Sequence, residues 1–201
     1  MAYPTVSKTY GFQPVQRLDG LPYAGAIRQI PIAAAYATAI LNGDTVAVDT
    51  TGFLVAKTTT NSGDSVGVLV GCQYVNSSNQ TVQGQYYPAA ASTAANPAYA
   101  YVVDDPNATF KVVATVAGSS TPTAATRALV GSNVAIVANT GNTSTGDSYY
   151  GIDGTSTTTA ALPIRVVDVV PGTSYVSGGT TYYYEYIVKI NLHQYNNTTG
   201  V

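Results

Sequence analysis

The sequence has very few of the side chains that enzymes use as acids, bases and nucleophiles. Among its 201 residues there is one His, one Cys and no Trp, and only 9% are charged. Glu185 is the only glutamate, His193 the only histidine and Cys72 the only cysteine. A histidine-based triad would have to use His193, and a zinc site would find only two His or Cys ligands in the whole chain. We therefore predict that the protein is not an enzyme and needs no cofactor or metal.

The sequence also lacks features that other classes of protein require. The chain has 8 basic against 10 acidic residues and a pI near 5.0, whereas a nucleic-acid binder usually carries a basic stripe. The segment MAYPTVSKTYGFQPVQ lacks the apolar centre of a signal peptide, and no apolar run reaches membrane-spanning length. A single cysteine cannot form an internal disulfide. We expect no nucleic-acid partner, no membrane and synthesis in the cytoplasm.

The residues that are abundant are typical of strands and turns. Val, Thr, Ala and 17 Tyr alternate with Gly-rich connections, and Asn42-Gly43 and Asp49–Gly52 are turn signals. Strands are predicted at 45–48, 53–56, 65–75, 99–103, 109–116, 133–138, 148–152, 164–170 and 181–193. Residues 123–130 are the best candidate for a short helix. The prediction is an all-β barrel or sandwich body, either as one unit or divided into two small β subdomains.

Alternation within two of these strands predicts where single residues lie. In 65–75, Val66, Val68, Val70, Cys72 and Tyr74 fall on one face, so Cys72 is interpreted as a buried structural thiol. Residues 181–193 place Tyr182, Tyr184, Tyr186, Val188, Ile190 and Leu192 together. His193 falls on the opposite, polar face and is interpreted as a solvated or hydrogen-bonded histidine rather than a catalytic one.

Residues 1–35 differ from the rest, because Pro4, Pro14, Pro22 and Pro31 recur along them and disfavour regular structure. The segment has a net charge of +2 in a chain of net charge −2. We predict an extended arm that docks on another surface, and an ordinary frayed terminus is the alternative. The predicted contact residues of the arm are Tyr10, Phe12, Arg17, Tyr23 and Arg28.

The composition also suggests a domain order. A first β subdomain is expected over residues 36–84 and a second over 99–195, followed by a tail at 196–201. The stretch 76–98 is poor in charge, and Pro88 and Pro97 bracket its alanines, so it is predicted to be a long loop, with 85–98 as an insertion between the subdomains. Asp104-Asp105-Pro106-Asn107 is interpreted as a turn rather than a calcium site.

The order of several short motifs resembles the head decoration, or capsid cement, proteins of tailed bacteriophages. The motifs that carry the resemblance are PYAGAIRQIPIA (22–33), NGDTV (42–46), VGVLVG (66–71), DDPN (104–107), FKV (110–112), TGDS (145–148), ALPIRV (161–166) and VKINLH (188–193). They cover most of the chain, and each is a turn or a strand.

The resemblance implies a structural virion protein on the outer surface of an icosahedral capsid. Such a protein is made in the bacterial cytoplasm, binds the major capsid protein and cements neighbouring subunits against internal DNA pressure. Its other partner would be itself, as a homotrimer or homodimer. The alternative of a different class is an adhesive module of a head or tail fibre that binds host glycans through exposed Tyr and Asn. A small hydrolase is disfavoured by the single histidine.

Overall fold

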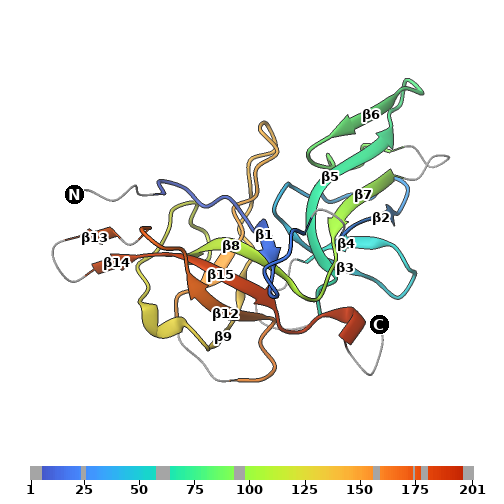
Figure 1. The fold of residues 1–201 in the computed structure, drawn as a ribbon. Helices are drawn as coiled ribbons and strands as arrows, with labels where there is room; N and C mark the ends of the chain where they lie inside the picture. Colours follow the sequence, from blue (N-terminus) through green and yellow to red (C-terminus); the bar gives the residue numbers. More distant parts are fainter. Residues whose placement is uncertain are drawn as a thin grey trace.

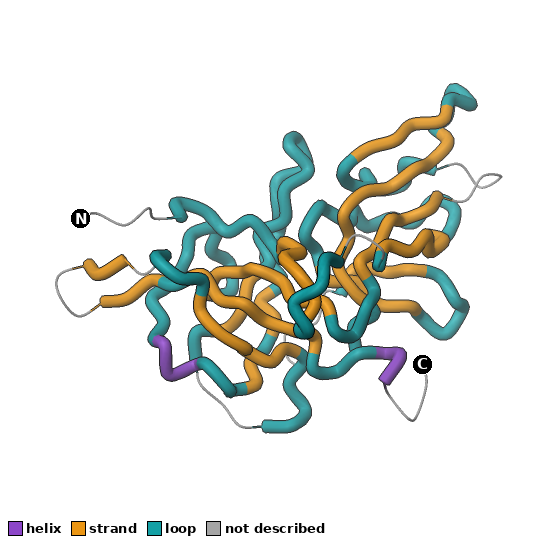
Figure 2. Tube along the Cα trace, viewed as in Figure 1, coloured by secondary structure: helices purple, strands orange, loops and turns teal. Residues whose placement is uncertain are grey.

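The computed structural model describes residues 6–23, 26–57, 64–92, 98–155, 159–173, 175–177 and 181–196. Strand accounts for 43% of the chain and helix for 4%, which confirms the all-β prediction. Figure 2 shows the strands gathered in two groups, with helix confined to two short turns. These turns are the 3-10 segments Arg127–Leu129 and Gln194–Asn196, so the helix predicted at 123–130 is a single turn.

The first group of strands is a closed barrel, at the right of Figure 1. Its strands are β2 (Ile27–Ile32), β3 (Thr45–Val48), β4 (Leu54–Ala56), β5 (Gly67–Val75), β6 (Thr81–Gly84) and β7 (Ala98–Val103). They follow the order β3-β4-β2-β7-β5-β6, and β3 also pairs with β5, so five of them form a ring. Closure removes the free edges of those strands, and β6 extends β5 as a hairpin. Fully buried side chains such as Ile32, Leu54 and Cys72 fill the ring.

The second group is a curled half-barrel sheet. Its strands are β1 (Gln13–Arg17), β8 (Ala108–Thr115), β9 (Asn133–Val134), β10 (Ile136–Val137), β11 (Gly151–Asp153), β12 (Ile164–Val169) and β15 (Glu185–Ile190). They follow the order β10-β11-β8-β15-β12-β9, and β1 lies along β8. Phe110 and Val112 in β8 are 1% and 0% exposed and lie in the core as predicted, but Thr109 and Val113 on the other face are also buried, so the burial of β8 does not alternate. A separate hairpin of β13 (Tyr175–Ser177) and β14 (Thr181–Tyr183) projects from this group in Figure 1.

The two groups have separate cores and pack against each other through two barrel residues that join the half-barrel core. Val68 and Val103 belong to barrel strands, yet both are fully buried in the cluster that contains the half-barrel residue Phe110. A parallel backbone bridge joins Ser65 to His193 across the same junction. The barrel and the half-barrel therefore fold around one continuous interface.

The prediction of an extended arm over residues 1–35 is wrong for the residues that form strands. β1 pairs antiparallel with β8, and β2 lies between β4 and β7 in the closed barrel. Proline does not prevent this, because Pro14 sits next to an irregularity in β1 and Pro31 occupies a half-buried position in β2. Residues 1–5, 24 and 25 of the predicted arm lie outside the described residues.

Other predicted boundaries also shift because partners lie far apart in sequence. Residues 98–103 form β7, a strand of the barrel, although 99–195 was expected to be a separate second subdomain. Within the predicted loop 76–98, residues 81–84 form β6 against β5. The expected insertion 85–98 contributes the fully buried Tyr87, whose backbone bridges to Ile40. Of the predicted tail, only Asn196 lies within the described residues.

Two predicted strands are interrupted. Thr181–His193 is not one strand: β14 ends at Tyr183 and pairs with β13, whereas β15 begins at Glu185 and pairs with β8 and β12. In β5, the pairing with β7 shifts between Leu69 and Gly71. This bulge changes which face each residue takes, so Leu69 and Cys72 fill the barrel while Val68 packs against the half-barrel.

Candidate functional site

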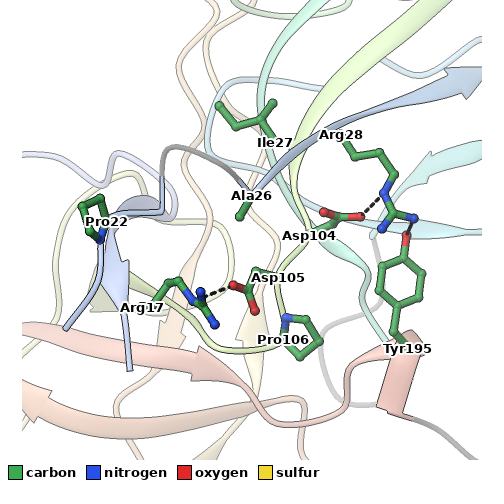
Figure 3. A pocket seen from close by; sticks show the side chains of 9 residues that line it. All are labelled: Arg17, Pro22, Ala26, Ile27, Arg28, Asp104, Asp105, Pro106 and Tyr195. Atoms are coloured by element: carbon green, nitrogen blue, oxygen red, sulfur yellow. Dashed lines mark hydrogen bonds and ion pairs between the residues drawn. The ribbon is translucent and has the colours of Figure 1, made fainter. Parts of the chain in front are cut away.

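A cleft of about 450 Å³ opens where the barrel meets the half-barrel. Two of the predicted contact residues, Arg17 at the end of β1 and Arg28 in β2, lie on its walls. The turn 104–106, which leads from β7 into β8, and Tyr195 in the last 3-10 turn complete the lining (Figure 3). The cleft therefore combines segments from the start, the middle and the end of the chain.

Each arginine of the cleft is paired with an aspartate of the turn between β7 and β8. Arg17 Nε lies 2.9 Å from Asp105 Oδ2, and Arg28 Nε lies 2.9 Å from Asp104 Oδ2. Arg17 Nε and Asp104 Oδ2 have no aligned hydrogen-bond partner, so we treat these contacts as ion pairs. Asp104 is 7% exposed at its side chain, whereas Arg28 is 61% exposed. Arg28 thus neutralises a buried carboxylate and still presents its guanidinium to solvent.

Arg28 is further positioned by Tyr195. Its Nη1 donates a hydrogen bond of 3.2 Å to the Tyr195 hydroxyl, and its guanidinium carbon lies 5.0 Å from the centre of the Tyr195 ring. Burial is the main factor that raises the pKa of Tyr195 above its ordinary value. The phenol therefore stays neutral at physiological pH, and the cation is held over the ring face.

Apolar side chains are exposed next to these arginines. The large apolar residues at the surface of the described part of the chain are Val15, Leu18, Leu21, Ile27, Tyr99, Val116 and Tyr195. Four of them fall within residues 15–27. Ile27 and Tyr195 line the cleft, and Leu18 and Leu21 adjoin the lining residues Arg17 and Pro22 in sequence. We call the surface formed by Leu18, Leu21, Ile27, Arg28 and Tyr195 the junction face. Clustered apolar exposure of this kind is typical of protein-binding surfaces.

The other predicted contact residues do not form part of the junction face. Phe12 is 1% exposed and packs in the half-barrel core, so the prediction that it contacts a partner is wrong. Tyr23 is half-buried against the same core. Tyr10 is also half-buried, and its hydroxyl donates a 2.5 Å hydrogen bond to Glu185 Oε1, which Lys111 Nζ approaches to 3.3 Å. These aromatic residues fix the N-terminal segment to the body instead of extending from it.

His193 and Cys72 are buried rather than poised for chemistry. His193 was predicted to be solvated or hydrogen-bonded, and the second alternative is the one observed: it is 2% exposed, and its Nδ1 accepts from the Tyr195 backbone N–H at 3.2 Å. Burial lowers the pKa of His193, and the nearby Asp104 carboxylate partly opposes the shift. Ser65, its bridge partner, is fully buried and cannot meet a substrate. The Cys72 thiol donates to the Tyr86 carbonyl, and burial raises its pKa to about 11.

Two other kinds of site have no candidate within the described ranges. No three His, Cys, Asp or Glu side chains there come together as a metal-binding group. None of the helical turns in those ranges has the length and hydrophobicity needed to cross a membrane.

Sequence reasoning missed the partners that make the junction face. Asp104, Asp105 and Tyr195 lie far from the N-terminal strands in sequence, and nothing in their local pattern marks them as neighbours of Arg17 and Arg28. The sequence offers one signal. The chain has few charged residues, and an arginine or aspartate that becomes buried near apolar strands is usually paired with an opposite charge.

No family model matches the sequence, and comparison with curated proteins and with solved structures finds no significant similarity. The fold and the junction face define an all-β protein in which a closed barrel packs against a half-barrel and an apolar, arginine-bearing surface is exposed between them.

Proposed function

We propose that this protein decorates the outside of a tailed-bacteriophage capsid and cements neighbouring major capsid subunits. The observation that carries the proposal is the junction face, where exposed Leu18, Leu21 and Ile27 adjoin the ion-paired Arg17 and Arg28. The order of turn and strand motifs along the chain, which resembles phage decoration proteins, supports the same function. In this proposal the N-terminal region makes the contact as part of the folded body, not as a loose arm.

The chemistry of the junction face suits a protein surface. Full burial of a leucine side chain contributes on the order of 1.5–3 kcal/mol. Leu18 and Leu21 are 49% and 54% exposed, so burying the exposed half of both would supply about that amount for the pair. Arg28 can add a second hydrogen-bonded partner, such as a carboxylate or a backbone carbonyl of the capsid protein, because its side chain is 61% exposed. The aspartate ion pairs hold both arginines in place before binding, which reduces the entropy lost on association.

Cementing then follows from avidity. A homotrimer or homodimer of this chain would present two or three junction faces, and each contact after the first would be intramolecular. Modest individual contacts would therefore hold many copies on the outer capsid surface. The protein would be made in the bacterial cytoplasm and would reach the virion by assembly on the finished shell.

The test is binding of the purified protein to capsids that lack it, measured by co-sedimentation. The double variant Leu18→Asp/Leu21→Asp places charges on the junction face, and Val116→Asp is the matched control because Val116 is 52% exposed in a turn outside that face. We expect the double variant to bind at least tenfold more weakly and the control to bind as the wild type does.

Circular dichroism and thermal unfolding verify that both variants are folded. Undiminished binding by the double variant would show that the junction face is not the contact. Failure of the wild-type protein to bind the capsids would refute decoration itself.

A further inference from the structure

A second groove, distinct from the junction face, runs between the N-terminal segment and the turn that precedes β11. Its volume is about 560 Å³, and its walls include Lys8, Tyr10, Asn142, Asp147 and Tyr149. In Figure 1 the 142–147 turn (orange) rises at the top, whereas the 3-10 turn that carries Tyr195 lies beside the C-terminus at the lower right. The two surfaces share no lining residue.

Both walls of the groove are fixed by contacts with the body. On one side, the Thr9 backbone N–H donates to the Ser120 carbonyl at 2.9 Å, and the Tyr10 hydroxyl is held by Glu185. On the other side, the Gly146 carbonyl accepts from the Asn42 backbone N–H at 3.0 Å, and a parallel bridge joins Asn42 to Asp147. The groove is therefore preformed, which lowers the entropic cost of binding a small ligand.

The turn places an amide and a carboxylate next to each other. Asp147 Oδ2 accepts a 2.6 Å hydrogen bond from the Thr145 hydroxyl, and Asn142 Oδ1 accepts from the Ser144 N–H at 2.9 Å. The carboxylate is thereby oriented as an acceptor, and the Asn142 amide keeps its NH₂ group as a donor. An acceptor and a donor side by side complement two adjacent hydroxyl groups, each of which can both donate and accept.

The remaining residues of the groove suit a sugar better than a charged ligand. Tyr149 is half-buried and supplies aromatic surface on which the C–H face of a pyranose ring can pack. Lys8 and Asp147 carry opposite charges, so the lining has no excess of one sign to select an anion or a cation. The hydroxyls of Ser7 and Thr145 add further polar groups.

We propose that this groove binds a neutral saccharide that bears adjacent hydroxyl groups. Asp147 and Asn142 bind the hydroxyl pair, and Tyr149 packs against the ring. The site is independent of the junction face, so a particle-bound copy whose groove faces solvent could hold a saccharide at the virion surface.

The test uses saturation-transfer NMR on the full chain with glucose, galactose, mannose and N-acetylglucosamine as separate probes. Saturation transfer from the wild type to at least one probe is expected. Asp147→Asn and Tyr149→Ala should each weaken that signal about tenfold or more, because each removes one side of the recognition. The matched controls are Asp168→Asn, an exposed carboxylate on β12, and Tyr99→Ala, an exposed tyrosine on β7; neither should change it.

Two results would overturn the proposal: no saturation transfer from any of the four sugars, or a signal that Asp147→Asn and Tyr149→Ala leave unchanged. A loss of equal size in the controls would place the binding elsewhere and would also overturn it. Capsid co-sedimentation of Asp147→Asn separates this site from the decoration function. It should match the wild type whether or not the sugar binds.

Discussion

Asp44 is a carboxylate with little access to water, in the turn before β3. It is 3% exposed, and its Oδ2 accepts from the Leu41 backbone N–H at 2.8 Å within the turn that begins β3. Burial raises its pKa to about 6, and contacts with Ser148 and Leu41 oppose that shift only in part. The folded protein therefore binds a proton at this site more tightly than the unfolded chain does.

This difference predicts a pH dependence of stability. The pKa of Asp44 is higher in the folded state, so its favourable contribution is complete below about pH 4 and is lost as pH rises through about 6. The loss amounts to about 3 kcal/mol in the free energy of unfolding. Urea unfolding of the wild type and of Asp44→Asn across this range measures it, and the variant should lack the decline.

Asp49 provides a control, because its pKa is shifted in the opposite direction to that of Asp44. It is exposed, and the hydroxyl of Thr51 is the main factor that lowers its pKa. Its contribution is present above the unfolded pKa and is lost as the pH falls, so Asp49→Asn should leave the decline between about pH 4 and pH 6 in place. If wild type and Asp44→Asn showed the same pH profile, the Asp44 carboxyl would not be the group responsible.

Cys72 gives a second prediction for a single residue. Its thiol is fully buried in the barrel and its pKa is raised to about 11, so almost none of it is the reactive thiolate at neutral pH. A thiol reagent should label Cys72 only in denaturant, and labelling is measured by mass spectrometry. Cys72→Ser should lower the free energy of unfolding by about 1–2 kcal/mol because it places a hydroxyl among apolar side chains. Rapid labelling of the native protein would contradict the observed burial.

At the scale of the element, β2 decides whether the N-terminal region is an arm or part of the barrel. It pairs with both β4 and β7, and Ile32 is fully buried, whereas Gln29 in the same strand is exposed. Ile32→Ala should lower the free energy of unfolding by about 2–5 kcal/mol, and Gln29→Ala should change it by about 0.5 kcal/mol or less. Chemical denaturation of the two variants measures the difference. Equal stability of both variants would show that β2 does not contribute to the barrel.

Arg28 also lies in β2, and its ion pair makes it a poor position for a test of capsid binding. Arg28 neutralises Asp104, whose side chain is only 7% exposed, so Arg28→Ala would leave a buried carboxylate without its cation. Weaker capsid binding by that variant could then arise from damage to the fold. For this reason Leu18 and Leu21, which are 49% and 54% exposed, are the better positions for a binding test.

At the scale of the whole molecule, decoration predicts a change in the shell rather than in the protein. A ligand that binds the intact lattice but not separated subunits stabilises the lattice by mass action. Decorated particles should therefore release their DNA at a higher temperature than undecorated ones, as followed by a DNA-binding dye during heating. Adding back the wild-type protein should restore the higher temperature, and Leu18→Asp/Leu21→Asp should not. Equal release temperatures with and without the bound protein would contradict a cementing role.

The sequence by itself determined most of the strands and the all-β class. Residues 45–48, 108–115 and 164–169 form strands where alternation and turn residues predicted them, because local patterning specifies which residues can line one side of a sheet. It also predicted the burial of Cys72. Of the five predicted contact residues, Arg17 and Arg28 lie together in the cleft, while Tyr10, Phe12 and Tyr23 pack onto the body.

Only the tertiary structure decided which strands pair and therefore which surfaces exist. The prolines and uneven spacing of β1 and β2 give no period and predict an arm, yet β1 pairs with the distant β8, and β2 pairs with β4 and β7. The bulge in β5 places Val68 and Cys72 in different cores. His193 is buried where its backbone bridges to Ser65, between the barrel and the half-barrel. Pairing of this kind depends on backbone N–H and C=O groups that every residue except proline carries in full, so side-chain patterns specify a strand far better than they specify its neighbour.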